Sequence, residues 1–378
     1  MITLKESSVI NNINFLKKRL GKRVILSAVV KANAYGHGIE QMVPMLQRSG
    51  VNHFSVFSYC EALRVEASLM EPATIMIMGY IDPNEVVDAV ERGFEFFVFN
   101  IVRLNAALDA ALHLSKPARI HLEAETGMNR SGLDLEELKC AIETINGNAD
   151  SFVVAGFCTH LAGAESVSNY LRIRKQMKKF NRYLTLLKES GIVPELRHVA
   201  NSAASFVYPK TRLDLVRVGI MIYGFWSSTE VFIQYVGNRV NKRDPLKRIL
   251  GWQSRVMSVK EIKTGEYVGY GISFFAQTEM RMALIPVGYS DGYNRSLSNK
   301  GRVLVRGHLC SVIGLVNMNM LMVDITEVPD AVPGDQVVII GEQGEYEILV
   351  SAFSDISNKL NYEVLTQLNE SIQRKIIT

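Results

Sequence analysis

Residues 24–50 read VILSAVVKANAYGHGIEQMVPMLQRSG, and they carry a complete strand–loop–helix unit. The run 24–30 is apolar almost throughout, which is typical of a strand covered on both faces. The segment 39–50 has helical spacing and ends in a glycine, as a helix C-cap favours. Lys31 stands directly after the strand. A lysine at the end of a buried strand needs a partner or a function, and the rest of the chain must indicate which.

The same alternation continues to about residue 225. Seven further β-rich runs occupy residues 52–57, 73–79, 94–100, 118–125, 152–158, 195–200 and 213–219. Segments with helical spacing separate most of them. Eight β–α units of this size predict an α/β fold that begins with a (β/α)8 TIM-like barrel, and a doubly wound open sheet is the alternative.

After about residue 225 the pattern changes. Strand-like runs follow one another across short turns, and helical spacing returns only in residues 349–376. This predicts a mostly β C-terminal domain with terminal helices. We place the two domains at 1–228 and 229–378, with the boundary inside FWSSTEVFIQYVGNRVNKRDP, residues 225–245.

Composition limits the classes of protein to consider. The 378 residues are 48% hydrophobic and 21% charged, with a net charge of +4, which is globular and lacks the basic track of a nucleic-acid-binding protein. The four cysteines form no C-x-x-C pair, which argues against disulfides or zinc and favours a reducing compartment. No apolar run approaches the roughly 20 residues of a membrane span, and the first residues resemble no secretion signal. We therefore expect a cytoplasmic protein without metal, membrane or nucleic-acid partners.

Polar side chains gather after the predicted strands, where the reactive groups of a (β/α)8 barrel lie. The residues in such positions are Lys31, Asn33, Tyr35, His37, Arg130, His160, Asn201 and Ser202, and the last predicted strand itself carries Arg217. Lys31 either extends its amine toward solvent or bonds covalently to a carbonyl group of a cofactor or substrate. Burial would lower the pKa of its amine and supply the free base that this chemistry needs.

The loops after the last two predicted strands favour a phosphate. They read NSAAS, residues 201–205, and VGIMIYG, residues 218–224, and their small side chains let backbone N–H groups approach an anion. Ordinary N-capping by Asn201 or Ser202 explains the first loop equally well. A reactive lysine and a phosphate site together describe pyridoxal phosphate. Arg217, on the intervening strand, either meets the pyridine nitrogen of that cofactor or forms a structural salt bridge.

Six motifs in order carry a family resemblance over nearly the whole chain. They are AVVKANAYGHG (28–38), HVANSAA (198–204), RVGIMIYG (217–224), GEYVGYGISF (265–274), IPVGYSDGYNR (285–295) and MLMVD (320–324). The chain thereby resembles the bacterial alanine racemases, which are pyridoxal-phosphate enzymes with an N-terminal barrel and a C-terminal β domain. The resemblance implies an isomerase that interconverts L- and D-alanine.

The resemblance also implies roles for individual residues. Lys31 holds the cofactor and acts as one base, and Tyr270, which the partner subunit of a homodimer supplies, acts as the second. The other matches to cofactor-binding residues are Tyr35, His160, Ser202, Arg217, Gly219 and Ile220. The matches to residues that bind the substrate or line its access corridor are Arg130, Met318, Tyr289 and Arg295. Among these, Arg217 faces the pyridine nitrogen and His160 links Tyr270 to Arg217.

One departure from the family pattern concerns charge. Glu123 stands where a carbamylated lysine is common. A carboxylate carries the same charge as a carbamate, so we expect Glu123 to orient Arg130.

Other departures concern the substrate. Leu315 and Asn319 replace an arginine and an aspartate, and Glu370 replaces a tyrosine that narrows the pocket; a one-residue slip would put Asn369 there instead. A wider pocket lined by Glu370 would admit serine, lysine or arginine. Alanine is the first choice among these substrates.

Three other classes share part of this pattern. A barrel-type amino-acid decarboxylase would need a reactive cysteine in its second domain, where only Cys310 lies near, outside the motif. A pyridoxal-phosphate carrier protein would lack both the second domain and the Tyr270 motif. A metal-dependent barrel hydrolase would need ligands at several strand ends, and seven scattered histidines do not provide them. His37 has no role in these interpretations beyond capping a helix.

Overall fold

The structure is a computed structural model that describes residues 1–237, 240 and 242–378. The chain forms two compact units. The barrel unit comprises residues 7–31 and 42–248, and the C-terminal β unit comprises residues 1–6, 32–41 and 249–378. The expected boundary segment, 225–245, includes residues 238, 239 and 241, which lie outside the described residues. A functional division after residue 228 stays a prediction.

Eight parallel strands form the sheet of the barrel unit, and each falls within one predicted run. In sheet order they are β8 (Leu196–His198), β7 (Phe152–Cys158), β6 (Ala118–Glu123), β5 (Glu95–Val98), β4 (Thr74–Ile77), β3 (His53–Val56), β2 (Ile25–Val29) and β9 (Leu215–Val218). The two ends of this order meet at a parallel bridge between Asn201 and Arg217. There the Arg217 N–H donates to the Ala200 carbonyl over 3.1 Å. The sheet is a nearly closed barrel, as predicted, and the doubly wound alternative is wrong.

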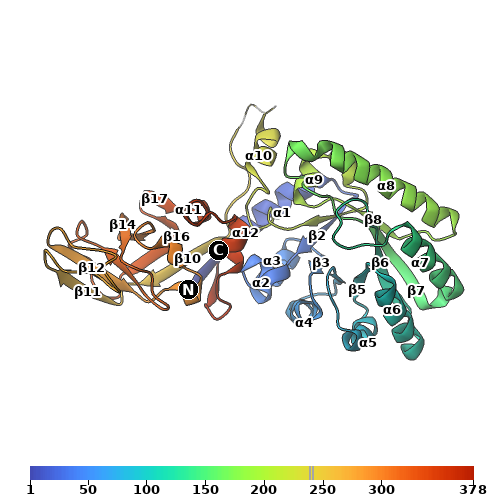
Figure 1. The fold of residues 1–378 in the computed structure, drawn as a ribbon, viewed down its shortest axis with the longest axis horizontal. Coiled ribbons are helices and arrows are strands. Elements are labelled where there is room, and N and C mark those ends of the chain that lie inside the picture. Colours follow the sequence, from blue (N-terminus) through green and yellow to red (C-terminus); the bar gives the residue numbers. More distant parts are fainter. Residues whose placement is uncertain (238–239, 241) are drawn as a thin grey trace. The chain divides into compact units, whose positions relative to one another are not determined.

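Helices lie around this sheet (Figure 1). They are α1 (Glu6–Leu20), α3 (Ile39–Arg48), α4 (Tyr59–Ser68), α5 (Pro83–Arg92), α6 (Ile101–Leu114), α7 (Leu135–Gly147), α8 (Tyr170–Glu189), α9 (Ser202–Val207) and α10 (Thr229–Val236), with 3-10 turns at Ala149–Ser151, Val167–Asn169 and Pro209–Thr211. Capping boxes begin α4, α5 and α7, at Ser58, Asp82 and Asp134. In each box a short polar side chain and a glutamate satisfy N–H groups that the first helical turn leaves open.

The second sheet lies in the C-terminal β unit and is mostly antiparallel. Its order is β11 (Ser258–Ile262), β12 (Met280–Ile285), β15 (Leu321–Asp324), β14 (His308–Ile313), β13 (Arg302–Val305), β16 (Gln336–Gln343), β10 (Leu250–Arg255), β1 (Ile2–Lys5) and β18 (Arg374–Ile377), and β17 (Tyr346–Ile348) pairs with β16. The same unit holds α11 (Val350–Ser357), α12 (Asn361–Thr366) and 3-10 turns at Tyr289–Asp291 and Arg295–Leu297. Its core includes the fully buried Trp252 and Tyr293. The mostly β C-terminal fold is confirmed.

The ends of this unit correct two expectations. Residues 374–377, expected to be helical, form β18, which runs parallel to β1 from the pair Ile2–Arg374. Residues 2–5, expected in the barrel domain, pair with β10 as well. Buried strand backbone needs hydrogen-bond partners on both sides, and β1 lies almost wholly buried between β10 and β18. Tertiary pairing therefore overrides the helical spacing at the end of the chain.

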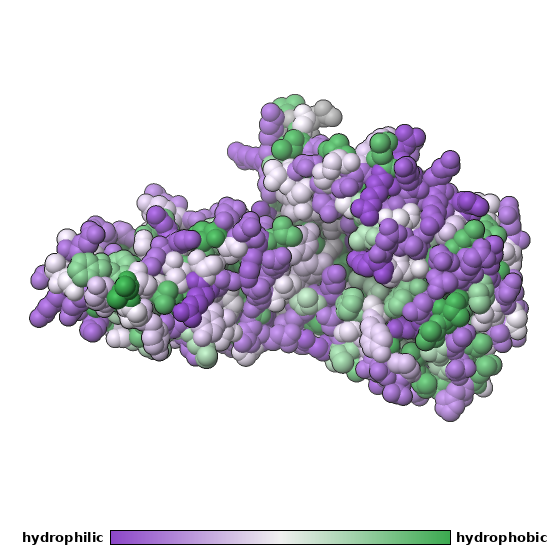
Figure 2. Space-filling model, viewed as in Figure 1, coloured by the Kyte–Doolittle hydropathy of each residue, from purple (hydrophilic) through white to green (hydrophobic). Residues whose placement is uncertain are grey.

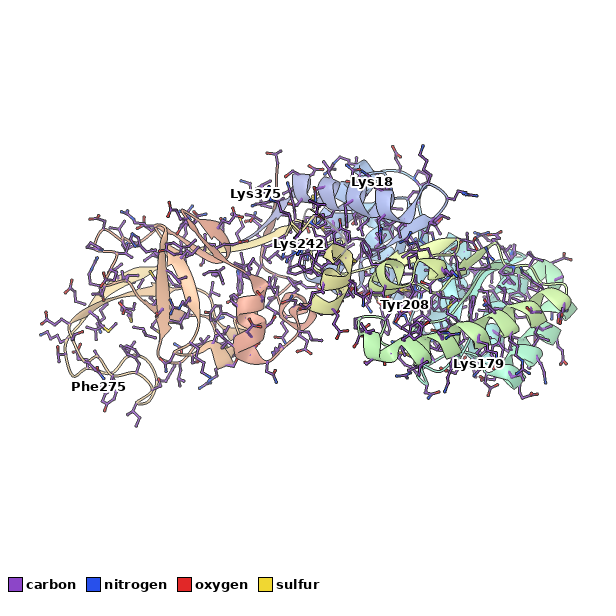
Figure 3. The ribbon with its side chains drawn as sticks, turned by 90° about the horizontal axis from the view of Figure 1, so that it is seen from above. Lys18, Lys179, Tyr208, Lys242, Phe275 and Lys375 are labelled. Atoms are coloured by element: carbon purple, nitrogen blue, oxygen red, sulfur yellow. The ribbon has the colours of Figure 1, made fainter. Side chains whose placement is uncertain are left out.

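Both units carry exposed apolar side chains as well as hydrophilic ones at their surfaces. Hydrophilic side chains dominate the visible face over α8 (Figure 2). Lys179 lies on the outside of that helix, and Phe275 lies on the loop between β11 and β12 (Figure 3). None of the helices among the described residues is long and apolar enough to cross a membrane.

Candidate active site

Lys31 follows β2 at the carboxyl end of the barrel strands. Two hydrogen bonds fix the end of β2: the Val30 N–H donates to the Ser55 carbonyl, and the Tyr223 hydroxyl donates to the Val29 carbonyl. The pKa of the Lys31 amine lies below its usual range, mainly because of burial and then because of the charge of Arg130, while Glu61 acts in the opposite direction. A lower pKa raises the fraction of neutral amine, which is the form that bonds to a carbonyl carbon or accepts a proton.

The chain after Lys31 makes a left-handed turn, α2 (Lys31–Tyr35). The φ angles of Ala32, Asn33, Ala34 and Tyr35 are 51° to 52°. A left-handed conformation costs about 1–2 kcal/mol for each residue other than glycine, so the surrounding contacts must hold it. The side chain of Asn33 does so by accepting from the Ile39 N–H over 3.1 Å.

His37 also supports this turn. Its Nδ1 lies 3.0 Å from the Tyr35 carbonyl, and burial lowers its pKa to about 4, so the ring is neutral near pH 7. Gly36 is required beside it, because a Cβ at Gly36 would lie 1.9 Å from the Leu365 carbonyl oxygen. The ring of Tyr35 is buried with its centroid 6.0 Å from that of Tyr362. His37, which the sequence left without an assigned role beyond helix capping, thus contacts the backbone of this turn.

Ser202 and the loop after β9 bring hydrogen-bonding groups together. The buried Ser202 hydroxyl accepts from the Gly219 N–H over 2.9 Å. Ile220 is fully buried, and no acceptor among the described residues takes up its N–H. Asn201 caps α9 by accepting from the Ala204 N–H. A buried, unoccupied N–H beside a hydroxyl suits an anion with several acceptor oxygens, such as a phosphate.

Arg217 on β9 lies inside the barrel, with 4% of its surface exposed. Its guanidinium donates to the Thr159 carbonyl over 2.9 Å, to the His198 carbonyl over 3.2 Å and to His198 Nδ1 over a short contact. None of the carboxylates among the described residues forms an ion pair with it. The structural salt bridge considered from the sequence is therefore absent from the described residues. His198 was missed in the sequence, although its place in the β-rich run 195–200 was visible.

Three further predicted residues lie in the barrel unit. Glu123 ends β6, is buried, and accepts from the Ser131 hydroxyl over 2.9 Å. Burial raises the pKa of its carboxyl, while Ser131 and the charges of Arg217 and Arg130 act in the opposite direction. Arg130 itself is exposed and makes no direct ion pair with Glu123.

His160 follows β7 and is half-buried. Burial, followed by the charges of Arg217, Arg130 and Lys31, lowers its pKa to about 3. A neutral imidazole beside these cations can accept or donate one hydrogen bond at each nitrogen.

The remaining predicted residues lie in the C-terminal β unit, mostly on its surface. Tyr270, in the loop between β11 and β12, is 71% exposed. The Met318 carbonyl accepts from the N–H and the hydroxyl of Ser290, and Asn319 donates to the same hydroxyl. Tyr289 and Arg295 are exposed close by in sequence.

The residues near the end of the chain are also at the surface. Glu370 is exposed, and its carbonyl accepts from Arg374 over 2.9 Å. The Asn369 side chain donates to the Ser290 carbonyl over 2.9 Å. Leu315 is half-buried in the turn before Met318. No group of three or more metal-ligating side chains occurs within the described residues.

Comparison with known proteins gives one consistent family. The family model for the N-terminal domain of alanine racemase matches residues 5–226, and the model for its C-terminal domain matches residues 249–376. A protein of Leptospira interrogans named alanine racemase is 34% identical over 379 residues, which cover 100% of this chain and 95% of that protein.

Solved structures agree in fold. The crystal structure of alanine racemase from Streptomyces lavendulae superposes with a TM-score of 0.90 at 29% identity, covering 100% of this chain and 96% of the other. The alanine racemase of Bartonella henselae, solved with covalently bound pyridoxal phosphate, gives a TM-score of 0.84 at 28% identity, covering 100% and 99%.

Proposed function

The chain belongs to the alanine racemase family, and from that premise we propose that it interconverts L- and D-alanine with pyridoxal phosphate, using Lys31 and Tyr270 as two bases. The family membership covers both domains, and relatives over the full length carry the name alanine racemase. The family match favours a racemase over the decarboxylase, carrier and hydrolase alternatives.

The residues of the barrel unit suit this cofactor. Lys31 has the lowered pKa that a covalently attached amine needs. The Ser202 hydroxyl and the available Ile220 N–H suit a phosphate, and the Gly219 N–H, which donates to Ser202 in this structure, is proposed as the third donor. Arg217 provides a permanent donor for an unprotonated ring nitrogen, since a guanidinium does not give up its proton in a protein. Pyridoxal phosphate, when bound, withdraws electrons and so lowers the barrier to breaking the Cα–H bond of the substrate.

Racemisation then needs one base on each face of the substrate, because the proton leaves from one face and returns to the other. Lys31 would take or return the proton on one face, and Tyr270 on the opposite face. A tyrosine acts as a base only where cations favour its anion, and His160 and Arg217 are the groups proposed to link it to such charge. Arg130 would bind the substrate carboxylate, with Glu123 orienting it through the Ser131 segment.

Tyr270 supports a homodimer with shared active sites. Its side chain is largely exposed in its own subunit, as are Ile272 and Phe275 in the same loop. An exposed loop of large apolar side chains is typical of a protein interface. We propose that this loop enters the partner's barrel. We also propose a cytoplasmic location, which the four free cysteines support.

The substitution Tyr270→Phe tests the two-base mechanism. It removes one hydroxyl and keeps the ring, so racemisation should fall roughly 100- to 10,000-fold, the range for loss of a general base. The visible absorbance of the bound cofactor should persist. Tyr267→Phe is the matched control, since Tyr267 lies in the same loop and its ring packs at a tilt of 60° against that of Phe275. Near-normal racemisation by Tyr270→Phe, measured by chiral separation of the products, would sink the two-base assignment.

A further inference from the structure

A chain of hydrogen bonds runs from Arg217 through the interior of the barrel. Arg217 on β9 contacts His198 Nδ1, and His198 Nε2 lies 2.8 Å from His121 Nδ1 on β6. His121 Nε2 lies 2.8 Å from Glu95 Oε2 at the start of β5. His121 and His198 are fully buried, and Glu95 is buried as well. The chain therefore leads from the carboxyl end of the strands toward their amino end.

The two ends of this chain fix every proton between them. Arg217 has donors and no acceptor, so His198 Nδ1 must carry no hydrogen. A neutral His198 then has its hydrogen on Nε2 and donates to His121 Nδ1. His121 in turn has its hydrogen on Nε2 and donates to the carboxylate of Glu95. All three bonds point the same way, and both imidazoles are neutral.

Glu95, the carboxylate at one end of this hydrogen-bonded chain, is bound by an arginine at the surface of the barrel. Arg119 donates to Glu95 Oε1 through Nε and Nη2, over 3.0 and 2.8 Å, and its Nη2 also donates to the exposed Glu195 over 2.7 Å. Burial alone would raise the pKa of the Glu95 carboxyl, but His121, Arg119 and His53 outweigh it and lower the pKa to about 2. Glu95 is thus ionised, whereas Arg217 is a buried cation that forms no ion pair within the described residues, although the charge of Glu123 acts on it.

The neighbouring strands make room for this chain. Gly156 on β7 faces His121, and a Cβ there would lie 2.0 Å from His121 Nδ1. Phe97 on β5 packs its ring against His121 and His198, at centroid distances of 6.0 and 5.8 Å, and also lies 5.9 Å from the Arg217 guanidinium. These contacts fix the ring planes, so the hydrogen-bond geometry does not depend on solvent.

We propose that Glu95 is a positioning residue that acts on Arg217 through His121 and His198. Its negative charge polarises the two imidazoles in one direction, and His198 Nδ1 becomes a stronger acceptor that holds the guanidinium in place and in its charged form. In a medium of low dielectric such polarisation along a chain strengthens each bond. The arrangement gives Arg217 a counter-charge that reaches it through two imidazoles. The inference rests on the proposed function in one respect, which is that Arg217 contacts the cofactor.

The direct test uses histidine protons and is independent of catalysis. In holoenzyme labelled with 15N-histidine, the imidazole resonances of His121 and His198 are assigned by substituting one histidine at a time. Both rings should be neutral and should carry the proton on Nε2 at neutral pH. A cationic ring, or a proton on Nδ1 of His198, would overturn the proposal.

The functional test compares two glutamates that contact the same arginine. Glu95→Gln keeps an acceptor oxygen and removes the charge, whereas Glu195→Gln removes the charge outside the chain. For Glu95→Gln, kcat should fall on the order of tenfold, as for other residues that orient a site group, with KM for L-alanine changed less than about twofold. Cofactor retention on dialysis should weaken too. Glu195→Gln should match the wild type in all three measurements.

The outcomes separate the two proposals. Equal behaviour of folded Glu95→Gln and Glu195→Gln holoenzyme contradicts the role of Glu95. If Glu95→Gln does not fold, the protonation of His121 and His198 in the wild-type holoenzyme still tests the proposal. A normal rate for Tyr270→Phe together with both rings protonated on Nε2 would remove the two-base mechanism and leave the role of Glu95 standing.

Discussion

The barrel unit and residues 249–378 bury different kinds of side chain. The barrel unit buries Glu95, Glu123 and Arg217 together with three histidines. Across residues 249–378, all of which the structure describes, no charged side chain and no histidine is buried. The proposed site residues of that region, including Tyr270 and Met318, are exposed.

This difference separates two ways of presenting a reactive group. A buried ionisable group is costly unless hydrogen bonds satisfy it, and once satisfied it is rigid. The barrel unit therefore holds its groups in position before any ligand arrives. An exposed tyrosine has no such support from its own chain, so it needs a second surface to become ordered and desolvated.

The largest expected effect tests whether each active site combines a buried Lys31 from one subunit with an exposed Tyr270 from the other. Lys31→Ala and Tyr270→Phe should each lose nearly all activity alone. When the two variants are mixed under conditions that exchange subunits, half of the dimers combine one chain of each kind. Each mixed dimer regains one intact site, so activity should return to about a quarter of the wild-type value. The racemisation rate of the mixture measures this, and a mixture as inactive as its parents would mean that each site is built from one chain.

Acid should affect the barrel unit more than the C-terminal β unit. Burial lowers the pKa of His53 to about 4. Burial and nearby cations lower the pKa of His160 to about 3 and hold the pKa of His198 well below its usual value. These rings stay neutral in the folded state, while in the unfolded chain they take up protons below about pH 6.5. Stability is therefore full above that pH and is lost as the pH falls toward 4. The loss is ~1.4 kcal/mol per pH unit for each such histidine.

The two tryptophans allow the effect of acid on the stability of each unit to be measured separately. Trp226 lies in the barrel unit and Trp252 in the C-terminal β unit. The C-terminal β unit also contains a buried histidine, His37, whose pKa is lowered to about 4. Variants that keep one tryptophan, through Trp226→Phe or Trp252→Phe, report urea unfolding of one unit by fluorescence. The midpoint reported by Trp226 should fall more between pH 7 and pH 5. Coincident midpoints at both pH values would contradict the expected difference.

The smallest expected effects come from two glycines with open space around them. Nothing lies within 4 Å of a Cβ at Gly147, the last residue of α7, or at Gly334, which has a φ of +96°. Gly147→Ala should stabilise the protein by about 0.4–1 kcal/mol by restricting the unfolded chain. Gly334→Ala should destabilise it by about 1–2 kcal/mol, because alanine is strained at that φ. Thermal unfolding of both variants checks the opposite signs, and equal signs would show that φ does not control the outcome.

Sequence alone predicted the barrel because its strands are short apolar runs separated by helical spacing, and all eight runs contain a strand. It also grouped Lys31, Ser202 and Arg217, since parallel strands in a barrel end on one face. The left-handed turn at residues 32–35 was not predictable, because Ala, Asn and Tyr do not usually adopt positive φ. His121 and His198 lay inside apolar runs, and only the pairing of β5, β6, β8 and β9 shows that Glu95 and Arg217 are joined through them.

The pairing of β1 has a consequence for how the chain is made. β1 is translated before the barrel, but its neighbours β10 and β18 lie beyond the barrel in the sequence. During synthesis β1 therefore stays unpaired until the barrel residues have been translated. Pairings between strands so far apart in the sequence form slowly. A fragment ending at residue 228 would carry β1 with both hydrogen-bonding edges open, which invites aggregation. A soluble isolated barrel should therefore begin after β1, at α1.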